Sequence, residues 1–355
     1  MSRVNYLREM PFYGLSDFQL IWENETCKQE ILTKMSNNGF MDFIKNSHSY
    51  SDENIDLQQY RYFDVDEYND LLKKDHKINI IHINCRMFSK NKGKILSFLQ
   101  SLDTEMDIIL LSEIGREGPR YLKSIFPNYD YEKDPPINNS YGGVAILAKK
   151  QFEMSINPEL KFTKQCDCTK CEYENVWVEI TCQNSHFFIG CIYRHPNGKI
   201  EHFTNQLSES LRKIRSDTTC LIGGDINIDL LNISHKDILN YTTELSSYNF
   251  LPRIVLPTRI TDSTCTLIDH LFLKLSNKHR DLDVSAGNIF AEITDHLPIF
   301  IRINLKSSTS TKRPMIRIIN DRSLLNFKMK CSTFEWDRMR SMSHIDHKFN
   351  FYKTI

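Results

Sequence analysis

The chain has 355 residues, which is enough for one large α/β domain with extensions or for two ordinary domains of roughly 150 residues each. Hydrophobic residues make up 40% and charged residues 25%, and this composition excludes a collagen-like, mucin-like or wholly disordered chain. Lys plus Arg and Asp plus Glu both number 45, so the formal net charge is zero. Any binding to nucleic acid must therefore come from a local basic face.

The apolar runs are short. The runs at residues 78–83 and 108–111 fall far below the roughly 20 residues that cross a bilayer, so we expect no membrane-spanning helix and no membrane partner. The first ten residues carry charge but no apolar block follows them, which is unlike a secretory signal. We therefore expect an intracellular protein whose ten cysteines are mostly free thiols.

The composition changes twice along the chain. Residues 1–76 are polar and rich in Asn, Asp, Glu and Tyr, and we interpret them as a weakly ordered leader with one amphipathic helix at residues 64–73. Residues 306–314 are rich in Ser, Thr and basic residues and end in Pro, as linkers do. We expect one domain at residues 77–306, followed by a linker and spacer at residues 307–355.

Between these boundaries, short β-rich segments alternate with helix-compatible stretches, which predicts an α/β fold. We expect strands at 78–83, 108–112, 144–148, 176–182, 187–193, 220–225 and 299–305, and helices at 92–101 and 202–215. The strands at 176–182 and 187–193 follow each other across a short polar connection without a helix. The sheet should therefore be mixed and partly antiparallel.

Acidic or amide side chains stand at the ends of several expected strands, where loops over a sheet edge usually hold a site. These segments are 82–86, 111–113, 192–197, 223–227 and 294–298. Taken singly, each carboxylate is more often a helix cap or turn residue. Asp269 differs, because a carboxylate inside the apolar segment 267–272 needs a partner when it is buried. His296 is a candidate for that partner, and a solvated loop histidine is the alternative.

Three cysteines lie close together at Cys166, Cys168 and Cys171. They could bind Zn²⁺ with Cys182 or His186 as a fourth ligand, but a structural zinc site usually shows two well-spaced pairs. We favour a reduced surface loop over a zinc site.

The ordered set of motifs resembles the endonuclease/exonuclease/phosphatase superfamily, and within it the apurinic-endonuclease-like nuclease domain of jockey-like non-LTR retrotransposons. The matching motifs, in the family's order, are Asn84, Ser112-Glu113, Gly142 to Ile146, Tyr193-Arg194 with Pro196, Gly224 to Asn227, Ile268 to His270, and Asp295 to Pro298. Residues 62–72 resemble the leader of such nucleases, and residues 326–337 resemble the spacer that leads toward a reverse transcriptase. The Asp-Asp pair of a polymerase is not found in a suitable setting.

The resemblance implies a four-layered α/β sandwich, in which two mixed β-sheets pack face to face and helices flank them. It implies an endonuclease that uses Mg²⁺, or Mn²⁺ in its place, to nick double-stranded DNA in the nucleus for target-primed reverse transcription. Element RNA and a reverse transcriptase would then be partners. Two alternatives stay open: a phosphatase or phosphodiesterase of the same fold, and an inactive or repurposed element remnant that binds DNA or a partner.

The resemblance also implies the metal ligands. Glu113 would be the principal one, supported by Asn84 and Asp295. Hard oxygen ligands of this kind suit Mg²⁺. One departure concerns Arg86, because apurinic endonucleases carry a second carboxylate at this position, two residues after the strand-end Asn.

The remaining roles follow in the same way. Asp225 would align or deprotonate the attacking water, and Asn227 would hold this water or the phosphate oxygens. His296 would stabilise the charge that develops on the phosphate, while Asp269 fixes its orientation. Contacts with the substrate are implied for Tyr193, Arg194 and Asn227.

Overall fold

The computed structural model describes residues 61–73, 77–136, 141–162, 173–182, 185–260, 265–276, 283–304 and residue 332. The chain divides into two compact units, residues 1–309 and 310–355, and the fold described below belongs to the first. The cysteine cluster, the leader before residue 61 and the spacer apart from residue 332 lie outside the described residues.

The first sheet has seven strands and is mixed. Two pairs, β1 with β14 and β2 with β3, are parallel, and the other neighbours are antiparallel. In spatial order the strands are β1 (Tyr62–Phe63), β14 (Val284–Ile289), β15 (Ile299–Ile303), β2 (Ile78–Asn84), β3 (Ile108–Ser112), β5 (Val144–Lys149) and β4 (Tyr129–Asp134).

The second sheet has six strands, of which only β8 and β9 run parallel to each other. In spatial order they are β10 (Leu251–Pro252), β13 (Asp269–Lys274), β9 (Thr219–Asp225), β8 (Ser185–Arg194), β7 (Tyr173–Cys182) and β6 (Glu153–Ile156). A separate antiparallel pair consists of β11 (Arg259–Ile260) and β12 (Cys265–Thr266).

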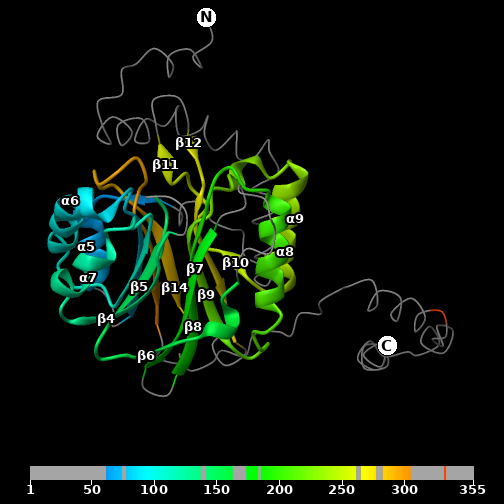
Figure 1. The fold of residues 1–355 in the computed structure, drawn as a ribbon, viewed down its shortest axis with the longest axis horizontal. Helices are drawn as coiled ribbons and strands as arrows, with labels where there is room; N and C mark the ends of the chain where they lie inside the picture. The colour runs from blue at the N-terminus through cyan, green and yellow to red at the C-terminus, as the bar shows by residue number, and fades with distance from the viewer. Residues whose placement is uncertain are drawn as a thin grey trace, which may run out of the picture. The chain divides into compact units, whose positions relative to one another are not determined.

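Helices cover the outer faces of both sheets (Figure 1). The first sheet carries α5 (Val65–Lys73), α6 (Phe88–Gln100) and α7 (Pro119–Ile125), and the second carries α8 (Ile200–Leu211) and α9 (Lys236–Ser247). The order of layers is therefore helices, sheet, sheet, helices, which confirms the predicted α/β sandwich.

Strand β2 shows why the central strands are apolar on both faces. Ile78 and Ile80 pack in the core between the sheets, whereas Ile81 and Ile83 pack in the core beneath the helices. Successive side chains of a strand point to opposite faces, so a strand covered on both sides needs apolar residues at every position. Continuous apolar runs in the sequence therefore predicted the central strands of both sheets.

The first sheet takes in residues that lie ahead of residue 77, where the sequence predicts the domain to begin. Strand β1 pairs with β14, and Tyr62 stacks on Phe290 with ring centroids 4.9 Å apart. Helix α5 places Tyr68 against Phe300, with centroids 4.5 Å apart. A strand of two residues has no periodicity of its own, so this part of the fold is decided by a partner more than 200 residues away in sequence.

Three buried cysteines within the described ranges are free thiols. Cys85, Cys191 and Cys220 are buried, and burial raises the pKa of each thiol, so these side chains are poor nucleophiles. Among the helices that the structure describes, none combines the length and the apolar character needed to cross a membrane.

Gly224 fixes the end of β9 at the point where the strand leads into Asp225. Its φ is +146°, and a Cβ atom there would lie 1.8 Å from the carbonyl oxygen of Ile192. We expect Gly224→Ala to lower the free energy of unfolding by more than about 1 kcal/mol, measured by urea denaturation. In the control Gly93→Ala, nothing lies within 4 Å of the added Cβ, so helix α6 should gain about 0.5–1 kcal/mol. Equal stabilities of the two variants would contradict this account.

Candidate active site

Strand register brings the ends of four strands to one edge of the sandwich. Asn84, at the end of β2, lies opposite Ser112 at the end of the parallel strand β3, and Glu113 follows directly. In the second sheet, Asp225 at the end of β9 lies opposite Asp269 at the start of the antiparallel strand β13. These acidic and amide side chains therefore come from fixed strand ends, although they are far apart in sequence.

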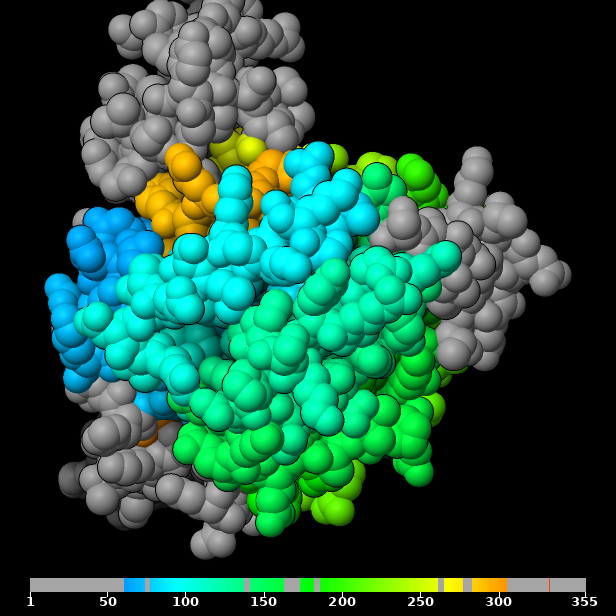
Figure 2. Space-filling view, turned by 60° about the vertical axis from the view of Figure 1, so that its left-hand side comes forward, coloured from blue at the N-terminus to red at the C-terminus, as the bar shows by residue number. Residues whose placement is uncertain are grey.

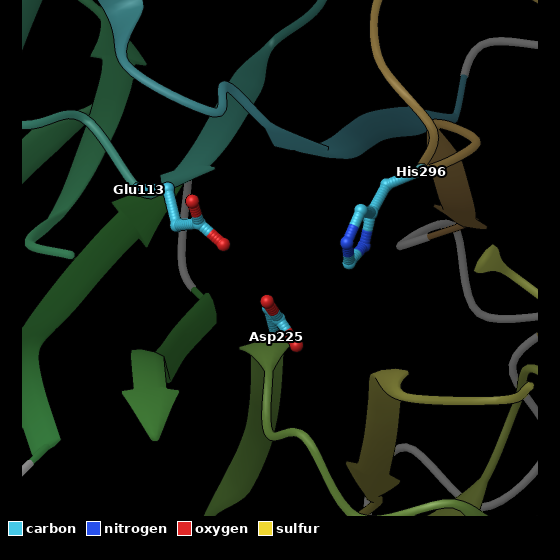
Figure 3. A group of neighbouring side chains, drawn as sticks. All are labelled: Glu113, Asp225 and His296. Carbon is cyan, nitrogen blue, oxygen red and sulfur yellow. The ribbon is translucent and has the colours of Figure 1, made fainter. Parts of the chain in front are cut away.

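Glu113, Asp225 and His296 point toward one another across this edge (Figure 3). One possible ligand atom from each lies within 4.8 Å of those of the other two. Glu113 has a φ of 50°, in the left-handed region that a side chain other than glycine rarely adopts. Backbone strain of this kind concentrates at functional sites, because the surrounding structure has to hold it.

Asn84 connects the two carboxylates. Its Nδ2 donates hydrogen bonds to Glu113 Oε1 at 3.1 Å and to Asp225 Oδ2 at 2.9 Å. Its Oδ1 accepts a hydrogen bond from the backbone N–H of Arg86 at 2.9 Å. In this arrangement the amide faces the carboxylates as a donor, whereas the resemblance implies an oxygen ligand at this position.

The carboxylates carry more negative charge than their protein neighbours neutralise. Burial raises the pKa of Asp225 well above its usual value, and the charges of Asp269 and Glu113 raise it further against the opposing effect of His296. A divalent cation between Glu113 and Asp225 would supply the missing positive charge. The residues present thus fit a hard divalent cation such as Mg²⁺.

Asp269 and His296 form a buried pair, as expected from the sequence. His296 Nδ1 lies 2.8 Å from Asp269 Oδ2, and Thr258 Oγ1 donates to the same oxygen at 2.7 Å. Burial alone would lower the pKa of His296, but the charge and hydrogen bond of Asp269, with Asp225 and Asp295, outweigh it and raise the pKa to about 9. The imidazole is therefore protonated at neutral pH.

A second histidine flanks Asp269 from the core. His82 Nδ1 lies 3.8 Å from Asp269 Oδ1, and its Nε2 lies 3.0 Å from Ser112 Oγ. Burial lowers the pKa of His82 to about 4, so this ring stays neutral. The sequence prediction missed it, although a histidine between isoleucines in β2 poses the same question of a buried partner that Asp269 poses.

Tyr193 lies beside Glu113 at the end of β8. Burial, followed by the charges of Glu113 and Asp225, raises the pKa of Tyr193, so the phenol stays protonated. Its ring packs edge-on against His195, whose Nε2 lies 3.2 Å from Glu174 Oε1. Glu174 and His195 were not predicted, because nothing in the local sequence pairs β7 with the loop after β8.

Arg194 faces inward, whereas the resemblance implies that it contacts DNA. Arg194 is 2% exposed. Its guanidinium donates to the carbonyl oxygens of Asn227 at 3.0 Å, Ile226 at 3.3 Å and Gly198. Asn227 Nδ2 donates in return to the Arg194 carbonyl at 2.9 Å. Arg194 therefore braces the loop that carries Asn227, since its Nη1 and Nη2 donate to backbone oxygens.

Asp295, for which the resemblance implies a supporting role at the metal, pairs with two arginines. Its Oδ1 lies 2.7 Å from Arg86 Nη1, and its Oδ2 lies 2.9 Å from Arg259 Nε. Within the described residues, it does not join the cluster of Glu113, Asp225 and His296. Both oxygens are engaged by arginines, which compete with a metal for the same lone pairs.

No protein-family model matches the chain, and no curated protein matches it in sequence. Solved structures do match in shape. The endonuclease domain of TRAS1, a telomere-specific non-LTR retrotransposon, is 16% identical over 65% of this chain and 100% of its own, with a TM-score of 0.51. An endonuclease/exonuclease/phosphatase from Bacteroides vulgatus is 17% identical over 65% of this chain and 100% of its own, with a TM-score of 0.50. The chain thus has the endonuclease/exonuclease/phosphatase fold.

The Asp269 carboxylate should control the protonation of His296. In metal-free protein, we expect Asp269→Asn to lower the pKa of His296 below about 9, because burial remains and the largest attracting charge is gone, while Asp225 and Asp295 still raise the pKa. Titration of the imidazole ring protons by NMR measures this, and an unchanged pKa would contradict the pairing.

The same shift predicts a pH dependence of stability. The folded pKa of His296 lies above its unfolded value, so its contribution is fully present below about pH 6.5 and is lost as the pH rises through about 9. The free energy of unfolding of metal-free protein should therefore fall across this window. Asp269→Asn should show a smaller fall, measured by urea denaturation at each pH.

Proposed function

We propose that this chain is a divalent-metal-dependent DNA endonuclease, which hydrolyses a phosphodiester bond and leaves a nick. The observation that carries the proposal is the convergence of Glu113, Asp225 and His296, with Asp269 directly behind the histidine. Hydrolysis of a phosphodiester needs charge neutralisation, a positioned water and a proton acceptor, and these side chains can provide all three.

The two carboxylates would hold the cation. When bound, a divalent cation neutralises the phosphoryl oxygens and makes a bound water more acidic. His296 is unsuited to be a third ligand while it is protonated, because metals bind the neutral imidazole. Its Nδ1 is held by Asp269, so Nε2–H remains to donate to a phosphoryl oxygen and to stabilise the charge that develops there.

Asp225 is the best-placed acceptor for the proton of the attacking water. Its Oδ1 accepts a hydrogen bond from the backbone N–H of Asn227 at 3.2 Å, which fixes the carboxylate. The cation would lower the pKa of Asp225, so this carboxylate would stay ionised and could accept a proton from the attacking water. Tyr193, protonated beside Glu113, would keep that carboxylate oriented and donate to the substrate phosphate as it arrives.

We further propose that the nick serves retrotransposon integration, with target DNA as the substrate and with element RNA and a reverse transcriptase as partners in the nucleus. The ordered motifs and the likeness in shape to the TRAS1 endonuclease domain support this role. The endonuclease would comprise residues 77–306 together with β1 and α5, which pair and pack with them.

Nicking of supercoiled plasmid in the presence of Mg²⁺ tests the activity. We expect conversion to the open circular form, no conversion in EDTA, and recovery when Mg²⁺ is restored. Glu113→Gln should lower the rate at least about 100-fold, because partners that only orient metal ligands already cost about 10–100-fold.

The matched control is Glu117→Gln, four residues further along the same segment, where the glutamate pairs only with Arg120 among the described residues. This control should nick at the parental rate. If the parent and Glu113→Gln are equally inert, the catalytic proposal fails. If the parent releases phosphate from monoesters and does not nick DNA, the chain is a phosphatase of the same fold.

A further inference from the structure

Two guanidinium groups meet one carboxylate at the rim of the site. Arg86 and Arg259 approach opposite oxygens of Asp295 at 2.7 and 2.9 Å. The Asp295 side chain is 17% exposed, whereas those of Arg86 and Arg259 are 60% and 37% exposed. The carboxylate is thus enclosed while both cations reach the solvent.

Arg86 is attached to the site by its backbone as well as by its charge. Arg86 and Met87 have φ values of 40° and 73°, and Asn91 Nδ2 donates to the carbonyl oxygens of Cys85 and Arg86 at 3.0 Å each. Such a backbone is costly for residues with side chains and persists only where other contacts fix it. The Arg86 N–H also holds Asn84 Oδ1, so the loop that orients Asn84 is the loop that presents the guanidinium.

Arg259 comes from the other side of the same edge. It forms an isolated antiparallel bridge with His296, and the N–H of Ile260 donates to the Asp295 carbonyl at 3.1 Å. Figure 1 shows β11 and the orange segment that leads into β15 at the same end of the sandwich. In Figure 2 this orange segment reaches the surface beside cyan segments from the first part of the domain.

The charge balance leaves one net positive charge, because two guanidiniums share a single carboxylate. Partly exposed ion pairs add little to stability, about 0–1 kcal/mol each, so stability does not account for this arrangement. Each guanidinium has five N–H donors in a fixed fork that matches the oxygens of a phosphate. A pair of arginines beside His296 therefore has the chemistry of a phosphate-binding site.

We propose that Arg86 and Arg259, held in place by Asp295, bind a backbone phosphate of the DNA outside the bond that is cut. The inference rests on the proposed function for its substrate, and it assigns Asp295 as a positioning residue for arginines in place of a metal ligand. The positive charge at this rim thus comes from protein side chains, those of Arg86 and Arg259.

Arg86 and Arg259 are called the clamp from here on. The dependence of DNA binding on salt concentration tests the clamp without any cleavage of the DNA. A short fluorescent DNA duplex is titrated with metal-free protein over a range of KCl concentrations, and the logarithm of the affinity is plotted against that of the salt concentration. Arg86→Gln and Arg259→Gln should each reduce the slope by about 0.9 and weaken binding roughly tenfold. Arg86→Lys should keep the slope, because it keeps the charge.

The matched control is Arg215→Gln. Arg215 is an exposed arginine that pairs with Asp217 just before β9, at the end of that strand opposite to Asp225, so its loss should leave the slope unchanged. Slopes equal to that of the parent in both Arg86→Gln and Arg259→Gln overturn the proposal. Thermal melting of each variant shows whether it is folded, and a variant that does not fold is replaced by the corresponding methionine variant, which also removes the charge and should show the same reduced slope.

Binding of Mn²⁺, measured by isothermal titration calorimetry, tests the role of Asp295. Asp295→Asn should bind Mn²⁺ with the parental affinity, whereas Glu113→Gln should bind it at least about tenfold more weakly. An equal loss in both variants returns Asp295 to the metal ligands and overturns the assignment.

The experiments can contradict the proposed clamp and the proposed endonuclease activity independently of each other. A parent that binds DNA with arginine-dependent slopes and does not nick plasmid keeps the clamp and loses the endonuclease. A parent that nicks plasmid, with slopes that do not change in the arginine variants, keeps the endonuclease and loses the clamp. A parent that does not bind the duplex at any salt concentration overturns the clamp.

Discussion

The site depends on two buried carboxylates that face each other across adjacent strands. Asp225 and Asp269 are fully buried and occupy paired positions of β9 and β13. Two like charges in such a place are costly unless each has its own counterpart. Asp269 is hydrogen-bonded to His296, whereas Asp225 accepts hydrogen bonds from the Asn84 amide and the Asn227 backbone N–H and has the Glu113 carboxylate near it. In the proposed function, the two acids therefore have different roles: Asp269 orients the His296 imidazolium, and Asp225 faces the cation.

The sandwich makes this arrangement rigid. Strands β2, β3 and β9 are buried along their whole length, between a second sheet on one side and helices on the other. Their ends therefore cannot shift without disturbing two cores. The loops that leave these ends carry residues with positive φ, Glu113 and Asn227 among them. Tight packing in the strands thus supports strain in the loops, and this fixes the side chains before a substrate arrives.

Charge changes sign between the centre and the rim. At the centre, carboxylates outnumber their cationic partners, and at the rim the arginines around Asp295 outnumber the carboxylate. A phosphodiester backbone needs positive charge both at the scissile group and beside it. In the proposed function, a metal provides the first and arginine side chains provide the second.

The sequence by itself determined the α/β class, the central strands and the ordered motifs, because apolar runs and the turns that end them are local features. It also determined that a carboxylate among apolar residues, Asp269, requires a partner. Only the tertiary structure decided that Arg194 turns inward, that Asp295 binds Arg86 and Arg259, and that His82 lies against Asp269. Arg86 and Asp295 are 209 residues apart, so their contact depends on strand register and side-chain direction. Hydrophobic periodicity records which face of a strand is buried, and it carries no information about which distant polar group will lie opposite.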